Sequence, residues 1–390
     1  MNESIAVNLV KDLIKIDSTN PGAYEGEIKD YIKEWLSLLP GVVITEEEVL
    51  PGRFNLMAEL PADVIEGEPV PPALVFICHM DTVVVGDGWT LPPFGALEMD
   101  NCIYGRGACD MKAGLACCMT AFANAAKRAH EEGIAPKRPL KLICSMDEED
   151  FMRGSEAAIR SGWVTKDDWV MDSEPTNKQI QVAHKGRTWY VIDVQGHTAH
   201  ASTPWKGSDA IAAMAEIIHE IRLAIESAPT HPDLGKSTVT FGQIQGGYRP
   251  YVVPDSAKLW IDMRLVPPLD TAHTTAIVDA AIARAKEAVP GIEATYTITG
   301  DRPYIEKDDN SPFLHALINA CECALGKTPE VSCFTGYTDT AVIAGKLNNH
   351  NCMSYGPGNL ENAHQPDEFV KIKAIERCVK VYTELTKVVF

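Results

Sequence analysis

The sequence has 390 residues, more than a single hydrophobic core usually serves, so we expect two domains or one large one. With 45% hydrophobic and 23% charged residues it has an ordinary globular composition, and its longest apolar runs are far too short to cross a bilayer. A formal net charge of −19 argues against nucleic acid or an anionic membrane as partner.

The N-terminal segment and the cysteines both indicate the compartment. MNESIAVNLVKDLIKID places apolar residues at helical spacing and has no signal-peptide core, so we expect a cytoplasmic protein. The eleven cysteines are odd in number and scattered, with no CxxC pair. They are therefore predicted to be reduced core residues in a reducing compartment.

The first ~180 residues alternate helical and strand-like segments. An apolar helical stripe runs from Ile28 to Leu39, and continuous apolar runs follow at 73–78, 140–146 and 168–171. A helix rich in small residues, about Lys112 to His130, separates the first two runs. Apolar strands separated by helices predict a mainly parallel sheet that helices cover on both faces.

From about His184 the pattern changes to that of half-exposed antiparallel strands. RTWYVIDVQG and KLWIDMRLVP alternate apolar and polar residues, and helical patterns follow Ser208 and span about 274–289. After about Arg302 the earlier pattern returns, with Ser311-Pro312 and Gly326 marking the ends of a helix. The predicted fold class is α/β: residues 1–183 and 300–390 form a discontinuous domain, into which a smaller α+β domain, 184–299, is inserted.

Acidic and histidine side chains follow each predicted buried strand. The members of this set are His79 with Asp81, then Asp110 in a glycine-rich turn, the acidic run 147–150, and Asp172 with Glu174. Ligands of open α/β sheets bind at the carboxyl ends of the strands, so we expect these side chains to share one crevice. One acid at a strand end is usually a helix cap or a solvated loop residue, but four successive segments indicate a shared site.

Carboxylates gathered in this way need a positive countercharge, because like charges raise each other's pKa. A metal ion is the usual countercharge, and a mixture of histidine and carboxylate ligands suits zinc, with cobalt or manganese as substitutes. A further histidine, His364, lies late in the chain in the loop GPGNLENAHQPDEFV. Alone it would be interpreted as a surface residue.

Seven motifs occur in order over nearly the whole chain: HMDTVVVGDGW, YGRGACDMKAG, MDEEDFMRGSEA, DSEPT, GHTAHASTPWKGSDAI, IDMR and GPGNLENAHQPDEF. Together they resemble the two-zinc amidohydrolase and metallopeptidase family of acetylornithine deacetylase, succinyl-diaminopimelate desuccinylase, aminoacylase and carboxypeptidase G. The resemblance implies a zinc-exopeptidase-like catalytic domain and makes the insert a lid or dimerisation domain.

The resemblance also implies five metal ligands for two Zn²⁺ per subunit: His79, Asp110, Glu149, Glu174 and His364. Asp110 would bridge the ions, with His79 and Glu174 on one and Glu149 and His364 on the other. Three ligand carboxylates, two zinc ions and a bridging hydroxide carry no net charge together, whereas a single zinc ion would leave the group negative.

Two acids beside these ligands have implied roles of their own. Asp81 would orient the imidazole of His79 through its second ring nitrogen. Glu148 would be the general base, which takes a proton from metal-bound water and returns it to the leaving amine. Sequence alone does not say which of Glu148 and Glu149 binds metal, and the order comes from the family.

The resemblance also implies substrate-binding roles for other positions. His200 in GHTAHAS would reach across a homodimer to polarise the scissile carbonyl. Arg264 in IDMR would receive a substrate carboxylate, the alternative being a strand-edge ion pair. Tyr251 stands where the family usually has an asparagine, and Gly336 and Thr338 match a carboxylate-binding loop.

The predicted function is zinc-dependent hydrolysis of the amide bond of a small N-acyl amino acid, in the manner of acetylornithine deacetylase. One alternative is a metallo-exopeptidase that cleaves short peptides with a free carboxylate. Another is a non-catalytic homologue that keeps the fold as a binding module. The presence of all five ligands and of Glu148 argues against this last alternative.

Overall fold

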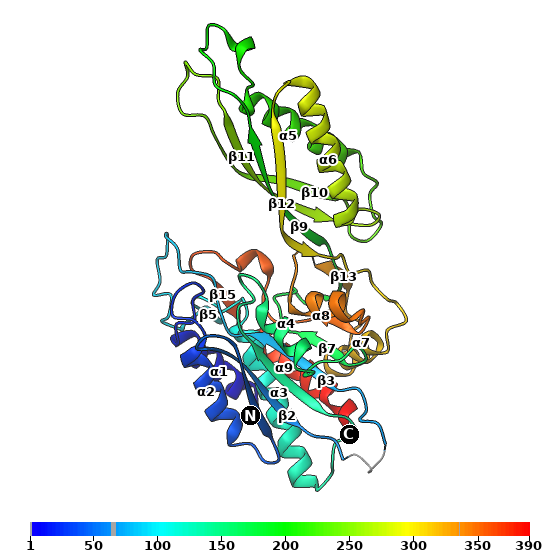
Figure 1. Cartoon of the computed structure of the whole chain (residues 1–390). Helices are drawn as coiled ribbons and strands as arrows, with labels where there is room; N and C mark the ends of the chain where they lie inside the picture. The colour runs from blue at the N-terminus through cyan, green and yellow to red at the C-terminus, as the bar shows by residue number, and fades with distance from the viewer. Residues whose placement is uncertain (1, 64–67, 335) are drawn as a thin grey trace. The chain divides into compact units, whose positions relative to one another are not determined.

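A computed structural model describes residues 2–63, 68–334 and 336–390 (Figure 1). The chain divides into two compact units. Unit 1 contains residues 2–63, 68–182, 307–334 and 338–390, and unit 2 contains 183–306 with 336–337. The predicted insert, 184–299, ends inside strand β12 (Glu293–Arg302), which pairs with β9 (Gly186–Gln195) along its length and therefore belongs to unit 2 as far as Arg302.

Unit 1 is built on an eight-stranded sheet. Its strand order is β1 (Val43–Leu50), β2 (Arg53–Leu60), β6 (Leu140–Ser145), β3 (Leu74–His79), β7 (Trp169–Asp172), β14 (Cys352–Ser354), β8 (Ile180–His184) and β13 (Val331–Phe334). The central strands β6, β3, β7 and β14 pair in parallel, and β1, β2 and β8 add antiparallel pairs toward the edges. The predicted α/β fold is confirmed, with the parallel pairing concentrated at the centre of the sheet.

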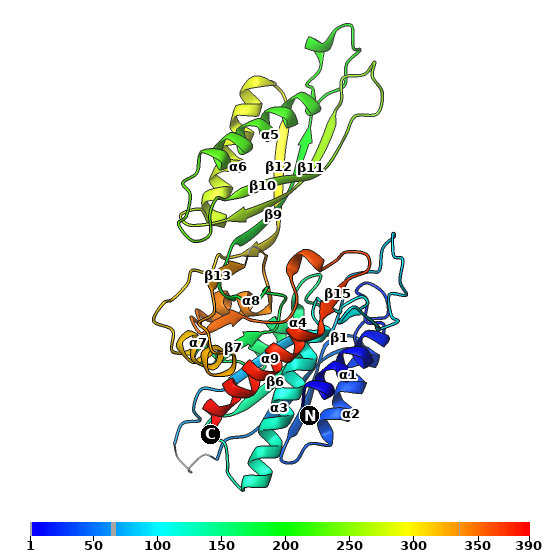
Figure 2. The same cartoon turned by 180° about the vertical axis from the view of Figure 1, so that it is seen from behind.

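Helices cover both faces of this sheet (Figures 1 and 2). One face packs on α1 (Asn2–Lys15), α2 (Gly26–Ser37), α3 (Lys112–Glu132), α7 (Pro312–Leu325) and α9 (Ile372–Leu385), and the other on α4 (Arg153–Arg160) and α8 (Asp339–Leu347). Alternate residues of a strand point to opposite faces. Leu74 and Phe76 therefore belong to the same hydrophobic core as the residues of α3, while Val75 and Ile77 are buried on the opposite face. This explains why the strands read as continuous apolar runs.

The ends of α7 follow the local sequence as predicted. The hydroxyl of Ser311 accepts a hydrogen bond from the Leu314 amide, Pro312 occupies the first turn, and Gly326 ends the helix at φ +69°. A small sheet of β15 (Phe369–Lys371), β5 (Cys102–Tyr104) and β4 (Leu97–Met99) joins the segment before α3 to the segment before α9. The 3₁₀ turn η2 (Leu360–Asn362) precedes β15, and η3 (Thr386–Val389) follows α9.

Unit 2 is a four-stranded antiparallel sheet with helices on one face (Figure 1). The strand order is β10 (Thr238–Gly246), β11 (Ser256–Leu265), β9 and β12, and the helices are α5 (Ala210–Ser227) and α6 (Thr271–Ala288). Every second residue of β9 and β11, such as Ile192 and Leu259, packs against these helices. The 3₁₀ turn η1 (Pro204–Lys206) precedes α5, and the other face of the sheet carries polar and aromatic side chains.

The cysteines and the hydrophobicity of the helices complete the description of the fold. All eleven cysteines are free thiols, and nine of them are buried. Within the residues that the structure describes, none of the helices combines the length and the apolar character that crossing a bilayer requires.

Candidate metal centre

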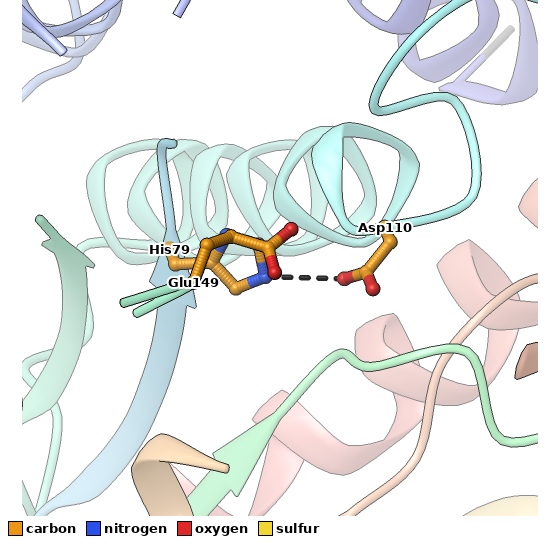
Figure 3. Close-up of side chains that lie close together, drawn as sticks. All are labelled: His79, Asp110 and Glu149. Atoms are coloured by element: carbon orange, nitrogen blue, oxygen red, sulfur yellow. Dashed lines mark hydrogen bonds and ion pairs between the residues drawn. The ribbon is translucent and has the colours of Figure 1, made fainter. Parts of the chain in front are cut away.

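Five side chains of unit 1 converge at the carboxyl ends of its parallel strands. His79 ends β3, Glu149 follows β6, Glu174 follows β7, Asp110 lies in the turn before α3 and His364 in the loop before β15. Figure 3 shows His79, Asp110 and Glu149 pointing toward one another. These are the five residues that the sequence analysis assigned as ligands, and neighbouring parallel strands bring three of them together.

The carboxylate of Asp110 lies between the two histidines. Its Oδ1 atom is 3.1 Å from Nε2 of His79, and its Oδ2 atom is 3.4 Å from Nε2 of His364. Each histidine also has a glutamate of its own, since Glu174 Oε1 lies 3.7 Å from His79 Nε2 and Glu149 Oε2 lies 3.1 Å from His364 Nε2. The geometry therefore contains two donor groups that share Asp110.

These separations fit a pair of metal ions. In a tetrahedral zinc site with bonds of about 2.0–2.2 Å, neighbouring donor atoms lie about 3.3–3.6 Å apart. The donor separations here run from 3.1 to 3.7 Å. His79, Asp110 and Glu149 also form one group whose donor atoms lie within 4.8 Å of one another, and His79, Glu148 and Glu174 form a second.

The neighbouring acids favour the charged form of both histidines when no metal is bound. Burial disfavours the imidazolium of His79, but the hydrogen bond of Asp110 and the charge of Glu174 outweigh it and raise the pKa of His79 well above its usual value. Hydrogen bonds to Asp110 and Glu149 raise the pKa of His364 to about 10. Although burial opposes it, bonding to these imidazoles lowers the pKa of Asp110.

Two acids of the site, Glu148 and Glu174, favour the protonated form when no metal is bound. Burial, with neighbouring carboxylates, raises the pKa of Glu148 and of Glu174 well above the usual value for a glutamate. Additional cations bound at this site would favour the ionised carboxylates. Both the charges of these side chains and the distances between their donor atoms therefore fit a site for metal ions.

Two glycines allow Glu174 to reach the site. A side chain at Gly114 in α3 would lie 2.2 Å from the carbonyl oxygen of Ser173. One at Gly356 would lie 2.4 Å from the carbonyl oxygen of Glu174. The sequence therefore needs glycine at both positions so that α3 and the loop after β14 can contact the backbone that carries Glu174.

Asp81 contacts His79 differently from the sequence expectation. The Nδ1 atom of His79 lies 2.8 Å from the backbone carbonyl oxygen of Asp81, whereas the carboxylate is 3.7 Å away. The carboxylate instead accepts hydrogen bonds from the backbone amides of Glu148 (3.1 Å) and Glu149 (3.2 Å). Asp81 thus orients the histidine through its main chain and the loop after β6 through its side chain.

A second buried carboxylate, missed in the sequence analysis, holds the other ligand loop. Glu368 is 1% exposed and accepts hydrogen bonds from the amides of Cys109 (2.7 Å) and Asp110 (3.0 Å) and from the guanidinium of Arg106 (2.5 Å). Its signal in the sequence was its place four residues after His364. Asn20, also missed, donates to Asp81 at 2.8 Å and to Asp147 at 3.2 Å.

Three more predicted positions, His200, Tyr251 and Arg264, belong to unit 2. His200 is exposed, and its Nδ1 atom accepts a hydrogen bond from the Ser202 amide at 3.2 Å, which leaves the proton of a neutral imidazole on Nε2. Arg264 donates to both oxygens of Asp262, at 2.8 and 3.0 Å, so the ion pair that was the alternative reading of this residue is present. Tyr251 is 60% exposed.

The predicted carboxylate-binding loop divides between the two units. Gly336 belongs to unit 2, where its backbone is hydrogen-bonded to the buried His184. Thr338 belongs to unit 1 and is buried, with its hydroxyl 2.9 Å from that of Thr340. The hydroxyl of Thr340 in turn donates to Asp172 at 2.6 Å. This position does not support a direct contact between the Thr338 side chain and a substrate.

The fold and the two-histidine site define the class of protein. Residues 75–387 match the model of peptidase family M20/M25/M40, and the chain belongs to this family. Members hydrolyse amide bonds and depend on metal ions.

Three relatives illustrate the range of this family. An acetylornithine deacetylase from Photorhabdus laumondii is 29% identical over 86% of this chain and 82% of its own. A tripeptidase structure from Staphylococcus aureus superposes with a TM-score of 0.80 at 23% identity, covering 99% of this chain and 98% of that one. A dinuclear metal-binding M20 peptidase from Bacillus subtilis superposes with a TM-score of 0.68 at 17% identity, covering 100% and 98%.

Proposed function

We propose that the protein hydrolyses the amide bond of a small N-acyl amino acid at a two-metal site, with Zn²⁺ as the native ion and Co²⁺ or Mn²⁺ as substitutes. The observation that carries the proposal is the Asp110 carboxylate, which faces a different histidine with each oxygen, while each histidine has its own glutamate. Three carboxylates and two imidazoles are a donor set that suits zinc. When bound, such ions polarise a carbonyl and lower the pKa of water.

Glu148 is the proposed general base. It is 8% exposed, and one of its oxygens lies within 4.8 Å of donor atoms of His79 and Glu174. Asp81 fixes its backbone amide, and burial raises the pKa of its carboxyl group, which makes Glu148 a stronger base than an exposed glutamate. Glu148 therefore takes the proton of the attacking water and delivers it to the leaving amine.

His200 and Arg264 are the proposed substrate contacts of unit 2. The Nε2 proton of a neutral His200 is a donor for the developing oxyanion, and it would act across a homodimer. Arg264 uses two of its five N–H groups on Asp262, so further donors of its guanidinium remain for a substrate carboxylate.

A metallo-exopeptidase is the second candidate function. The similarity over nearly the full length to a solved tripeptidase favours it, and the same metal site and general base would serve both reactions. The two functions differ in the group that occupies the acyl position.

The test is amine release by zinc-loaded protein from N-acetyl-ornithine, N-acetyl-methionine and a dipeptide, each with and without a chelator. Chelator-sensitive cleavage of an acetylated amino acid supports deacylation, and cleavage of the dipeptide alone supports the peptidase. Turnover that survives metal removal would contradict the proposed chemistry.

A further inference from the structure

The loop after β6 turns so that two consecutive glutamates serve different parts of the metal centre. Asp147 in this loop adopts φ +66°, in the left-handed region that residues other than glycine seldom occupy. Beyond it, Glu148 joins the donor group of Glu174, whereas Glu149 joins that of Asp110. The backbone conformation of Asp147 therefore decides where the proposed base lies relative to the ligand beside it.

Asp147 is held through its main chain and through both oxygens of its side chain. Its amide donates to Oε1 of Glu25 at 3.1 Å. Its Oδ1 atom accepts from Nη1 of Arg53 and from the side chain of Asn20, both at 3.2 Å, and Nε of Arg153 lies 3.1 Å from its Oδ2 atom. A residue keeps an unfavourable backbone conformation only where its surroundings fix it, and these contacts do so for Asp147.

Glu25 supplies the contact to the main chain of this loop. It lies directly before α2, and only 1% of it is exposed. Its Oε1 atom accepts from the Asp147 amide and, at 2.5 Å, from Nη2 of Arg53, while its Oε2 atom accepts from Nε of Arg53 at 2.9 Å. Because a buried carboxylate is unfavourable unless it is paired, the position of Glu25 depends on Arg53.

Arg53 on β2 uses all three nitrogens of its guanidinium in this arrangement. Nε and Nη2 bind Glu25, and Nη1 binds Asp147. The guanidinium lies 4.3 Å from the ring centre of Tyr24, and the side chain is 13% exposed. The planar fork of a guanidinium matches the two oxygens of a carboxylate, so one rigid cation joins two buried acids.

Stability alone is a weak explanation for this buried ion pair. Apolar residues of similar volume in place of a buried pair are often as stabilising or more so. What a hydrogen-bonded carboxylate adds is direction, because it fixes where the backbone N–H group that it accepts must point. Here that N–H group belongs to Asp147, the residue directly before the proposed base.

We propose that Glu25 and Arg53 are positioning residues, which hold Asp147 in its left-handed conformation and thereby aim the carboxylate of Glu148 at the attacking water. This inference rests on the proposed function, because it takes Glu148 to be the general base. Both residues act on the reaction through the backbone of Asp147 rather than by contact with the substrate. Their contribution adds to that of Asp81, which accepts the next two amides of the same loop.

The first test measures kcat and KM of zinc-loaded full-length variants, well below their melting temperatures. Arg53→Met removes the cation, and the milder Glu25→Gln keeps an acceptor for the Asp147 amide but turns an NH₂ group toward Arg53. In both variants we expect kcat to fall about 10- to 100-fold, KM to stay within about twofold, and both zinc ions to remain bound. A loss of stability alone would lower the melting temperature and leave kcat of the folded molecules unchanged.

The matched control is Lys29→Met. Lys29 is also 13% exposed, pairs with Glu46 at 2.5 Å and Asp30 at 2.8 Å, and lies 5.1 Å from the ring centre of Phe54. Its acidic partners belong to β1 and α2 rather than to the loop after β6, so this variant should keep the kcat of the wild type. Wild-type kcat in both test variants, an equal loss in the control, or a loss of kcat that only follows a loss of zinc overturns the inference.

Hydrogen exchange separates this inference from the proposed function. The amides of residues 147–149 are all hydrogen-bonded to carboxylates, so they should exchange slowly in the zinc-loaded wild type and in the control. In the two test variants they should exchange at least about 10-fold faster. Equal exchange in all four proteins would refute the positioning role even if no substrate is turned over. Faster exchange in the test variants, with a wild type that cleaves no amide, would support the hold on the loop and contradict the proposed function instead.

Discussion

Replacing Asp81 by asparagine tests whether its carboxylate holds the loop that carries the general base. Its Oδ1 atom accepts from the Glu148 amide, and its Oδ2 atom accepts from the Glu149 amide and the Asn20 side chain. An asparagine keeps one acceptor oxygen and presents an NH₂ group to the donors on the other side. At least one buried backbone N–H group therefore loses its partner.

The expected loss of activity follows from the number of hydrogen bonds that the substitution removes. A hydrogen bond to a charged group contributes about 1.5–3 kcal/mol, and a buried donor left without a partner costs a similar amount. If one such bond holds Glu148 or Glu149 in the catalytic geometry, Asp81→Asn lowers kcat/KM by about 10- to 150-fold. A loss of both amide contacts would lie above this range.

The assay is kcat/KM for the best N-acetylated substrate, with zinc content measured on the same sample. Burial raises the pKa of Asp81 to about 7, so the comparison belongs near pH 8, where the wild-type carboxylate is ionised. The control is Asp193→Asn, which removes a half-exposed carboxylate that pairs with Lys258 at 3.2 Å. A pair of this kind contributes less than about 1 kcal/mol, so the control should match the wild type. An Asp81→Asn enzyme with full zinc content and unreduced kcat/KM would refute the reasoning.

Three more predictions concern the base, the metal-free state and the assembly. Glu148→Gln should keep both metal ions by elemental analysis yet lose about 10²- to 10⁴-fold in kcat, and turnover close to wild type would remove Glu148 as the base. The pKa of His364 is raised from 6.5 to about 10 without metal, so the stability it contributes is present below pH 6.5 and is lost as the pH rises through 10. The melting temperature of metal-free protein should therefore fall between pH 7 and 10, and less steeply in His364→Gln; parallel curves would contradict this. Light scattering should give twice the mass of one chain, as a dimer-dependent role of His200 requires, and a fully active monomer would rule that role out.

The sequence predicted those parts of the fold that local pattern determines. The apolar runs at 73–78, 140–146 and 168–171 became β3, β6 and β7, because parallel strands buried on both faces leave little room for polar residues. The order of ligands along the chain followed from strand ends and from the family motifs. His364 could be assigned as a ligand only through the resemblance to the family, because a histidine in an exposed loop has no periodic pattern around it.

Contacts made by the main chain could not be predicted in this way. Asp81 and Glu368 accept hydrogen bonds from backbone amides. Nearly every residue type has such an amide, so the sequence pattern does not identify the partner. The pairing of strands could not be predicted either: β12 pairs with β9 on both sides of a break in register between Ile298 and Gly300, and only this break places Arg302 opposite Arg187. Alternation along one strand does not reveal which residue of another strand lies opposite.

The five candidate ligands lie between positions 79 and 364 of the chain, and this wide spacing has a consequence for how the enzyme matures. His364 lies beside Asp110 and Glu149, from which more than 200 residues separate it, and Glu368 must return to the loop before α3. Contacts so distant in sequence form late, because closing long loops is entropically costly. A growing polypeptide can complete most of unit 2 before residue 364 exists, but it cannot complete the metal centre. Capture of the metal ions would therefore mark the end of synthesis.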